Sequence, residues 1–306
     1  MLKGKDILTI IDLSREELET IFKTADEMLK YRKSRATLLS GYVLATAFFE
    51  PSTRTRLSFQ TAMLRLGGSI IDLGEIERSS VAKGENFADT IRMLDAYADI
   101  IVIRHRLEGA AKLAAEIAES PVINAGDGSR HHPTQAIIDL YTIRRYFKTI
   151  DGLIIGVLGD LKYGRATNSF INALTKFDVK KIYLISPPQL KLREETKERL
   201  KETKIEFYET SRLEEVINEL DVLYASRIQK ERFPDLAEYE MVRGSYRITP
   251  ESLKRAKGHL IILHPLPRVD EIDFKVDYLP YAKYFEQASY GIPVRMALLK
   301  LILLGE

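Results

Sequence analysis

The stretch YVLATAFFEPSTRTRLSF, residues 42–59, joins an apolar strand to the start of a helix. Its first eight residues, 42–49, are almost continuously apolar, which predicts a strand buried on both faces of a sheet. Apolar residues then recur at helical spacing, which predicts a helix over residues 53–66. Between the two lies a cluster of three hydroxyl side chains and two arginines within five residues. A strand that leads directly into a helix is the repeating unit of parallel α/β sheets.

The same alternation of strands and helices runs along the whole chain. Strands are expected at residues 42–49, 69–73, 99–104, 121–125, 153–159, 181–186, 205–209, 221–226 and 259–264. Helices are expected from a capping box at Ser14 to about Tyr31 and at 53–66, 87–97, 109–118, 133–147, 164–177, 194–203, 213–219, 250–256 and 292–304. The pattern restarts after the long helix at 133–147. Two such sets in 306 residues predict two α/β domains, each a parallel sheet flanked by helices.

Composition narrows the range of functions. Hydrophobic content of 45% and charged content of 29% are typical of a soluble globular protein. The net charge of +2 makes nucleic acid a poor partner, and no apolar run is long enough to span a membrane. The chain has no cysteine, which excludes disulfides, thiolate nucleophiles and Cys-ligated metal sites. With no signal peptide in its first residues, it is expected to be cytoplasmic.

The cluster at Ser52, Thr53, Arg54, Thr55 and Arg56 follows the first strand and begins the next helix. Backbone N–H groups at a helix start, together with hydroxyls and a guanidinium, are the donors that bind a phosphate. The alternative is that one hydroxyl only caps the helix and the arginines are solvated. Capping explains one hydroxyl and not the whole set. A P-loop motif is absent, so ATP is not indicated.

Polar clusters also follow other strands, where ligands collect in parallel α/β folds. They are GDGSRHHPTQ (126–135), GDLKYGR (159–165), SRIQ (226–229) and HPLPR (264–268), with Arg104 at the end of the strand 99–104. The glycines of GDLKYGR do not fit a dinucleotide motif, and alone this segment would be an ordinary turn. The adjacent histidines 131 and 132 lack a carboxylate set that would complete a metal site. Lys83 lies in a polar loop, where a lone lysine is usually solvated.

Taken together, these motifs resemble the catalytic chain of the aspartate carbamoyltransferase family over nearly the whole length. The segments FEPSTRTR, SSVAKGE, EGAA, INAGDG, HPTQ, GDLKYGR, RIQKERF and HPLPRVDEI occur in the family's order and spacing. The resemblance implies transfer of a carbamoyl group from carbamoyl phosphate to the amine of L-aspartate, an early step of pyrimidine synthesis. It also implies a carbamoyl phosphate-binding domain formed by residues 1–133 and 289–306, and an aspartate-binding domain formed by residues 134–288.

The resemblance assigns each matching residue a role. The phosphate would be held by Ser52, Thr53, Arg54, Thr55 and Arg104. The carbamoyl oxygen would be polarised by Thr55, Arg104 and His132, and the carbamoyl NH2 held by Gln135 and the carbonyls of Pro265 and Leu266. Aspartate would be bound by Lys83, Arg165, Arg227 and Gln229. Ser79 and Lys83 would reach the site of an adjacent subunit in a trimer, and Glu50 and Arg232 would brace the site arginines and support domain closure.

The resemblance implies no cofactor and no metal. It leaves open whether separate regulatory chains bind. The chain departs from many family members at Arg106, at Arg130-His131 and at Ala166-Thr167-Asn168, and the last two place different groups beside the expected aspartate site. Apart from Glu50 and Asp160, no acidic residue near Arg165 and Arg227 in sequence is expected to pair with them.

Two rival functions stay open. Ornithine carbamoyltransferases share the phosphate motif and HPTQ, but typically carry HCLP and an acidic-SMG signature for a cationic substrate. This chain has HPLP and arginines at the second-substrate positions. A non-catalytic sensor of a phosphate metabolite could use the same cradle, although His132 and Lys83 would be unnecessary for binding alone.

Overall fold

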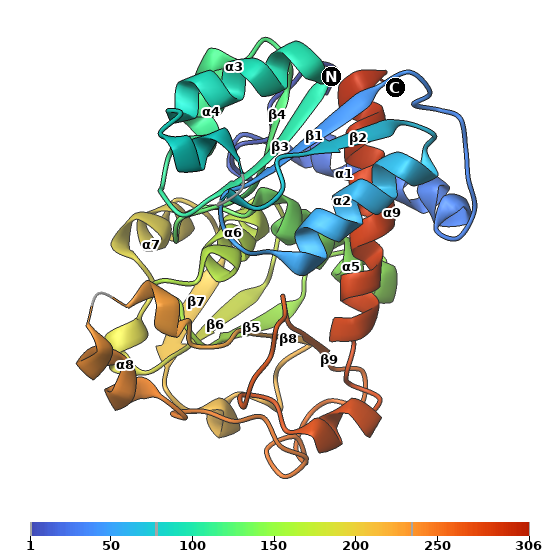
Figure 1. Ribbon diagram of the computed structural model, residues 1–306. Helices are drawn as coiled ribbons and strands as arrows, with labels where there is room; N and C mark the ends of the chain where they lie inside the picture. Colours follow the sequence, from blue (N-terminus) through green and yellow to red (C-terminus); the bar gives the residue numbers. More distant parts are fainter. Residues whose placement is uncertain (1, 77–78, 234, 306) are drawn as a thin grey trace. The chain divides into compact units, whose positions relative to one another are not determined.

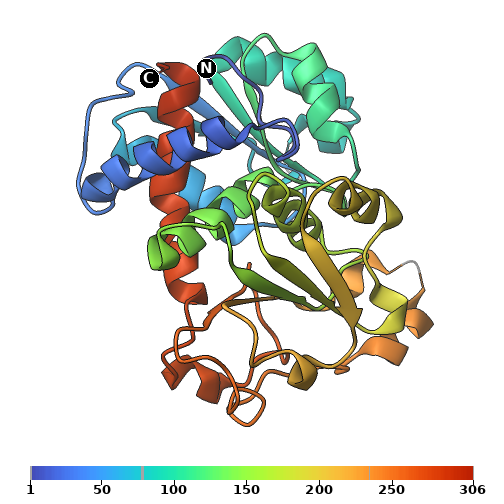
Figure 2. The ribbon, with the colours of Figure 1, turned by 180° about the vertical axis from the view of Figure 1, so that it is seen from behind.

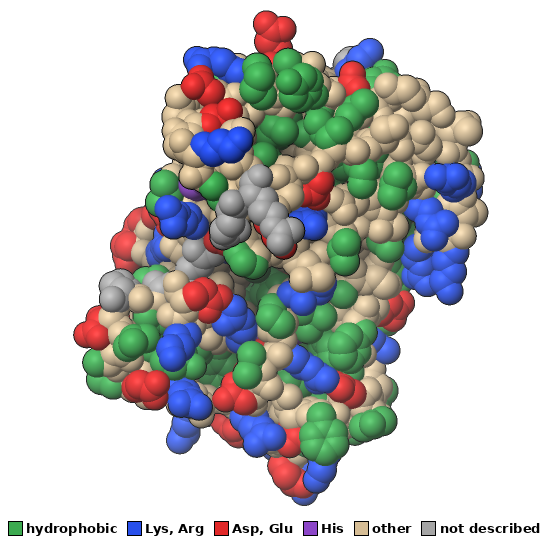
Figure 3. Space-filling view, in the orientation of Figure 1, with side chains coloured by type: hydrophobic (Ala, Val, Ile, Leu, Met, Phe, Trp, Pro, Cys, Tyr) green, Lys and Arg blue, Asp and Glu red, His purple; other side chains and the backbone are tan. Residues whose placement is uncertain are grey.

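The computed structural model describes residues 2–76, 79–233 and 235–305, without the side chain of Arg232. The chain divides into two compact units, residues 1–137 with 290–306 and residues 138–289. Among the described residues, no helix is long and apolar enough to cross a membrane. On the face shown in Figure 3, basic and acidic side chains are interspersed over most of the surface.

The first unit is built on a four-stranded parallel sheet in the order β2-β1-β3-β4. Its strands are β1 (Val43–Phe48), β2 (Ser69–Asp72), β3 (Ile100–His105) and β4 (Val122–Asp127). Its helices are α1 (Arg15–Met28), α2 (Thr53–Arg65), α3 (Phe87–Tyr97) and α4 (Ala110–Ile117). In Figure 1, α3 and α4 cover one face of this sheet, and α1, α2 and α9 cover the other. The strands are thus buried on both sides, as their apolar sequences predict.

Local sequence signals begin these helices. The Ser14 hydroxyl accepts a hydrogen bond from the backbone N–H of Glu17, and the Glu17 side chain accepts one from the backbone N–H of Ser14. This is the capping box expected from the sequence. Asn86 caps α3 through the N–H of Asp89, at 2.9 Å. The apolar faces of α3 and α4 then pack on alternate residues of the sheet, such as Ala45.

The second unit is built on a five-stranded parallel sheet in the order β7-β6-β5-β8-β9. Its strands are β5 (Ile154–Leu158), β6 (Lys181–Ile185), β7 (Glu206–Thr210), β8 (Val222–Ala225) and β9 (Ile261–Leu263). Its helices include α6 (Arg165–Leu174), α7 (Glu194–Lys201) and α8 (Leu236–Val242). Figure 2 shows α5, α6 and α7 along one face of this sheet. The other face is covered mainly by turns and short 3-10 helices, from which Leu213, Leu253 and Val276 enter the core.

Two helices cross the division between the units. Helix α5 (Pro133–Phe147) passes from the first unit into the second, and α9 (Tyr284–Leu303) returns from the second to the first. The predicted fold class is therefore confirmed: two parallel sheets flanked by helices, a long connecting helix and a returning C-terminal helix.

Three predicted helices differ from the structure. Residues 213–219 contain only the 3-10 helix Leu213–Glu215, and residues 250–256 form turns. In the second segment the N–H groups of Leu253 and Ala256 donate to residues three positions earlier, so no α-helical ladder forms. Helix α9 begins at Tyr284, eight residues before the predicted start, and contains Pro293 in its interior. Helix α8 and the 3-10 helix Ser80–Lys83 were not predicted from the sequence.

Candidate active site

In the first unit, the ends of β1 and β3 bring Glu50 and Arg104 together. Phe48 at the end of β1 lies opposite Arg104 in the parallel register. Two residues later, the Glu50 carboxylate (Oε1) contacts the Arg104 guanidinium (Nη2) at 2.8 Å. The Arg104 side chain is 15% exposed and the Glu50 side chain 13%. Arg104 Nη1 also donates to the Ala125 carbonyl, at 3.4 Å. The guanidinium is thereby held at the carboxyl edge of the sheet.

The hydroxyl cluster begins α2 directly after β1. Ser52 is the N-cap residue, but its side chain makes no capping hydrogen bond. Simple capping therefore does not explain this serine. Thr55 is buried and Arg54 is exposed at the helix start. The Ser58 hydroxyl donates to the Arg54 carbonyl at 2.7 Å, which fixes the first turn.

The loop after β4 is closed by contacts of its own residues and delivers His132 to the start of α5. The N–H of Asp127 donates to the carbonyl of His131 at 3.2 Å, and the Asp127 carboxylate accepts from the N–H of Gly109 at 2.9 Å. Gly128 has a φ of +47°, and a Cβ there would lie 2.3 Å from the Glu108 side chain. His132 is buried (6% exposed), and Gln135 is half-buried in the first turn of α5.

Lys83 and Ser79 lie in the segment between β2 and α3. The Ser79 hydroxyl accepts from the N–H of Val81 at 3.3 Å and donates to the Ile76 carbonyl at 2.8 Å, so it shapes the 3-10 helix Ser80–Lys83. The Lys83 side chain is exposed. Among the described residues of the first unit, nothing joins Lys83 to the cluster formed by Ser52, Thr55 and Arg104.

In the second unit, the loop after β5 is organised around Asp160. This carboxylate is fully buried and accepts hydrogen bonds from the N–H groups of Lys162, at 3.2 Å, and Tyr163, at 2.8 Å. Burial raises the pKa of Asp160 to about 6, although backbone N–H groups, including that of Gln229, favour its charged form. Asp160 therefore links the loop after β5 to the loop after β8. Arg165 is the first residue of α6 and is 5% exposed.

Two residues of α6 that were expected to place different groups beside the aspartate site, Thr167 and Asn168, strengthen the same junction. The Thr167 hydroxyl donates to the Ser226 hydroxyl at 3.2 Å, next to Arg227. The Asn168 side chain donates to the carbonyls of Leu161 and Gly164, at 3.2 and 3.1 Å. Both side chains are buried and make contacts inside the unit, so they shape the loops that carry the arginines.

Arg227 and Gln229 follow β8 at the same edge of the sheet. The expectation that only Glu50 and Asp160 could pair with the arginines was wrong, because the Arg227 guanidinium forms an ion pair with both oxygens of Glu231. The two residues are four positions apart on the turn that contains the 3-10 helix Lys230–Arg232, so local geometry brings them together. The predicted brace residue Arg232 has its side chain outside the described part of the chain.

The loop after β9 carries Pro265 and Leu266 and is held by hydrogen bonds to His264 and Glu271. The N–H of Leu266 donates to Nδ1 of His264 at 2.8 Å, and Nε2 of His264 contacts the Glu271 carboxylate at 2.7 Å. Pro265 has no N–H, and both Pro265 and Leu266 are half-buried. Each unit thus places the predicted residues at the carboxyl ends of its strands, with phosphate-type donors in the first unit and arginines in the second.

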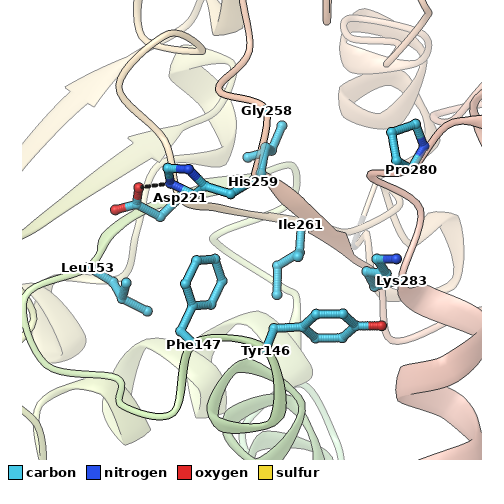
Figure 4. Close-up of a pocket in the computed structure, with 10 residues that line it drawn as sticks. Tyr146, Phe147, Leu153, Asp221, Gly258, His259, Ile261, Pro280 and Lys283 are labelled. Atoms are coloured by element: carbon cyan, nitrogen blue, oxygen red, sulfur yellow. Dashed lines mark hydrogen bonds and ion pairs between the residues drawn. The ribbon is translucent and has the colours of Figure 1, made fainter.

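A separate pocket of about 550 Å³ lies at the opposite, amino edge of the second sheet (Figure 4). It is lined by Tyr146, Phe147 and residues that precede β8 and β9, and none of the predicted site residues line it. His259 Nε2 contacts Asp221 Oδ1 there at 2.8 Å. Asp221 also accepts from the N–H of Ile154 and from Lys257, so this carboxylate connects the starts of the strands.

Several supporting residues were missed by sequence reasoning. They are Glu231, which pairs with Arg227, the carboxylate Glu271 under the loop after β9, and Gln287, which accepts from the N–H of His264 at 2.8 Å. Arg295 was also missed, although it donates to the Ser58 hydroxyl at 2.7 Å under the first turn of α2. Of these residues, Arg295 alone carried a sequence signal, a charged residue inside the apolar segment of α9. Among the described residues, no group of three or more His, Cys, Asp or Glu side chains could hold a metal ion.

This combination of fold and clusters defines an α/β enzyme that acts on small anionic substrates. Two family models match the chain: "Aspartate/ornithine carbamoyltransferase, carbamoyl-P binding domain" over residues 5–145, and "Aspartate/ornithine carbamoyltransferase, Asp/Orn binding domain" over residues 151–302. The chain belongs to the aspartate/ornithine carbamoyltransferase family.

Relatives cover the chain from end to end. It is 65% identical over 302 residues to the aspartate carbamoyltransferase catalytic subunit of Thermofilum pendens, covering 99% of this chain and 96% of that protein. The aspartate transcarbamoylase of Trypanosoma cruzi, solved with carbamoyl phosphate and aspartate, is 38% identical with a TM-score of 0.94, over 99% of this chain and 98% of the other. The catalytic subunit of M. jannaschii aspartate transcarbamoylase is 53% identical with a TM-score of 0.89, over 97% of each chain.

Proposed function

We infer that this protein is an aspartate carbamoyltransferase, which transfers the carbamoyl group of carbamoyl phosphate to the amino group of L-aspartate. The products are N-carbamoyl-L-aspartate and phosphate. The reaction is an early step of pyrimidine synthesis. The observation that carries this inference is the sorting of donors between the two units. Hydroxyls and basic side chains suited to a phosphate lie in one unit, and Arg165 and Arg227, suited to carboxylates, lie in the other.

The phosphate is assigned to the start of α2. Ser52, Thr53, Arg54 and Thr55 follow β1, where the helix dipole and backbone N–H groups favour an anion. Arg104 lies at the end of the adjacent strand, held by Glu50. With Thr55 and His132 it is assigned to the carbamoyl oxygen, where negative charge develops during attack. Phosphate is the leaving group in this assignment, so none of these hydroxyls acts as a nucleophile.

The chemistry is an addition of the amine to the carbamoyl carbon followed by elimination of phosphate. The aspartate nitrogen forms a bond to the carbamoyl carbon, and the bond from that carbon to the bridging phosphate oxygen breaks. The phosphate leaves with that oxygen and takes the proton released by the amine. No protein nucleophile or base is required, and positioning with charge stabilisation supplies the acceleration. Gln135 and the carbonyls of Pro265 and Leu266 are assigned to the carbamoyl NH2.

The aspartate carboxylates are assigned to Arg165, Arg227 and Gln229, with Lys83. Arg227 is paired with Glu231 in this structure and its side chain is 23% exposed, so in this assignment an aspartate carboxylate shares or replaces the contact with Glu231. The residue ranges 1–133 with 289–306 for carbamoyl phosphate, and 134–288 for aspartate, stay part of this proposal, as does a cytoplasmic location.

Arg227→Ala should raise the KM for aspartate about 10- to 100-fold, because it removes a charge-assisted, bidentate partner of a carboxylate. Carbamoyl phosphate binding should change little. Steady-state kinetics with each substrate varied in turn measure both. The matched control is Arg212→Ala, which removes another arginine of the second unit that pairs with a nearby glutamate, Glu215. The assignment is wrong if Arg227→Ala weakens carbamoyl phosphate and leaves the aspartate KM unchanged.

We propose a homotrimer in which Ser79 and Lys83 complete the site of the adjacent subunit. The Lys83 side chain is exposed and forms no hydrogen bond or ion pair with the Ser52–Thr55 cluster among the described residues of its unit, which supports this arrangement.

Hybrid trimers provide the test of this shared site. Lys83→Ala and His132→Ala chains should each be nearly inactive, whereas a mixture that is denatured and reassembled should regain activity. Some of its interfaces then combine an intact Lys83 from one chain with an intact His132 from the next. Each variant reassembled alone is the control. If hybrid trimers form and stay as inactive as the parents, Lys83 does not act across subunits.

A further inference from the structure

A set of buried polar side chains lies beneath the loop that carries Pro265 and Leu266. We call it the His264 network: His264, Glu271, Gln287 and Asp139, each at most 4% exposed. All four lie in the second unit. Buried ionisable and amide groups are costly unless they are fully hydrogen-bonded, so a connected set of this kind at a strand end calls for a functional explanation.

The contacts of His264 determine which ring nitrogen carries the proton. The N–H of Leu266 must donate to Nδ1, at 2.8 Å, so Nδ1 is the unprotonated acceptor. Nε2 then carries the proton and donates to Oε1 of Glu271, at 2.7 Å. Burial lowers the pKa of His264, in keeping with this neutral ring.

The second oxygen of Glu271 is also fully used. Oε2 accepts from the N–H groups of Val269 and Asp270, at 3.0 and 3.1 Å. Burial acts to raise the pKa of Glu271, but the hydrogen bond from His264 and those from the backbone outweigh it, and the pKa is lowered overall. Glu271 is therefore a carboxylate that accepts hydrogen bonds on both oxygens and ties both ends of the loop together.

Helices α5 and α9 anchor the backbone of His264. The backbone N–H of His264 donates to the Gln287 side-chain oxygen at 2.8 Å, and the Gln287 side-chain nitrogen donates to Asp139 Oδ1 at 2.6 Å. The orientation of the Gln287 amide follows from these two contacts. The short loop is thus connected to two long helices through one histidine.

We propose that His264 and Glu271 are positioning residues, which hold the Pro265 and Leu266 carbonyls so that carbamoyl phosphate is selected over acyl phosphates lacking the NH2 group. The inference rests on the proposed function, because it uses the carbamoyl NH2 as the donor. Carbonyls held rigidly as acceptors bind two N–H groups well. They reject a methyl group in the same place, since the acceptors then stay buried without partners. A mobile loop could turn away and would lose this discrimination.

Acetyl phosphate is the probe, because it replaces only the NH2 by a methyl group. In Glu271→Gln the side chain keeps its shape, but its single oxygen cannot accept from both His264 and the backbone N–H groups. Binding of carbamoyl phosphate and of acetyl phosphate is measured by calorimetry for the intact protein and the variant. We expect carbamoyl phosphate to bind about tenfold more weakly in Glu271→Gln, with acetyl phosphate changed less than about threefold.

His264→Asn provides a second variant. An asparagine oxygen can still accept from the N–H two residues ahead, as in an Asx turn, but the side chain no longer reaches Glu271. This variant should also lower the ratio of the affinity for carbamoyl phosphate to the affinity for acetyl phosphate. The matched control is Asp221→Asn, which alters the other histidine–carboxylate pair flanking β9, at the opposite edge of the sheet, and should leave the ratio unchanged.

Three outcomes would overturn the inference. One is that the intact protein binds both phosphates equally. Another is that both ligands weaken by the same factor in the variants, as expected for general damage. The third is that the ratio of affinities stays unchanged in whichever of Glu271→Gln and His264→Asn folds. Because only binding of the first substrate is measured, these outcomes are separate from a failure to carbamoylate aspartate, which would count against the proposed function.

Discussion

Arg54→Ala should lower turnover by about 100-fold or more at saturating substrates. The residue lies in the first turn of α2, two residues after the N-cap Ser52, where its guanidinium can stabilise the charge that develops on a departing phosphate. Removing one charge-assisted donor to a developing charge in a site shielded from water typically costs about 10²- to 10³-fold in rate. The free energy of unfolding should change little, because the Arg54 side chain is exposed.

Arg56→Ala is the matched control for this prediction. Arg56 lies two residues further along α2, carries the same charge and contacts Asp72 at 3.3 Å. It has no assigned role in the reaction, so its removal should leave turnover within about threefold of the intact protein. Steady-state assays of both variants decide the matter. Turnover of Arg54→Ala within threefold of the intact protein would mean that the start of α2 does not hold the leaving group.

The positions of the predicted site residues followed from local sequence patterns. An apolar run followed by a helical pattern identifies the end of a strand, and in parallel sheets all such ends lie on one edge. Ser52, Arg104, Arg165 and Arg227 could therefore be located without any knowledge of tertiary contacts. Strong local signals, such as the Ser14 capping box, also gave helix starts correctly.

Features that depend on contacts distant in sequence could not be predicted. Glu271 contacts His264 because the loop after β9 folds back on that residue. Gln287 lies in α9 because this helix begins earlier than its sequence pattern indicated. Helix α9 is buried and apolar on most sides, so its amphipathic signal is weak, and a helix was predicted only for residues 292–304. At residues 250–256, turns replaced a helix whose N-terminal signals were present but which lacked a long apolar face.

The second large effect concerns the choice of amine. Aspartate offers two carboxylates, which can pair with Arg165 and Arg227, whereas ornithine would bring a side-chain cation toward the same guanidinium groups. Glu231 does not reverse this argument, because its charge is already paired with Arg227. Loss of an ion pair combined with like-charge repulsion should separate the two amines by on the order of 10³-fold in kcat/KM.

The most direct measurement is therefore a carbamoylation assay of the intact protein, with carbamoyl phosphate and either aspartate or ornithine offered separately. Product formation is followed by chromatography, and phosphate release is followed in parallel. The account predicts N-carbamoyl-L-aspartate and phosphate in equal amounts, with ornithine on the order of 10³-fold slower. Equal rates with both amines would contradict the assignment of the arginines, and carbamoyl phosphate binding without any turnover would contradict the proposed enzyme itself.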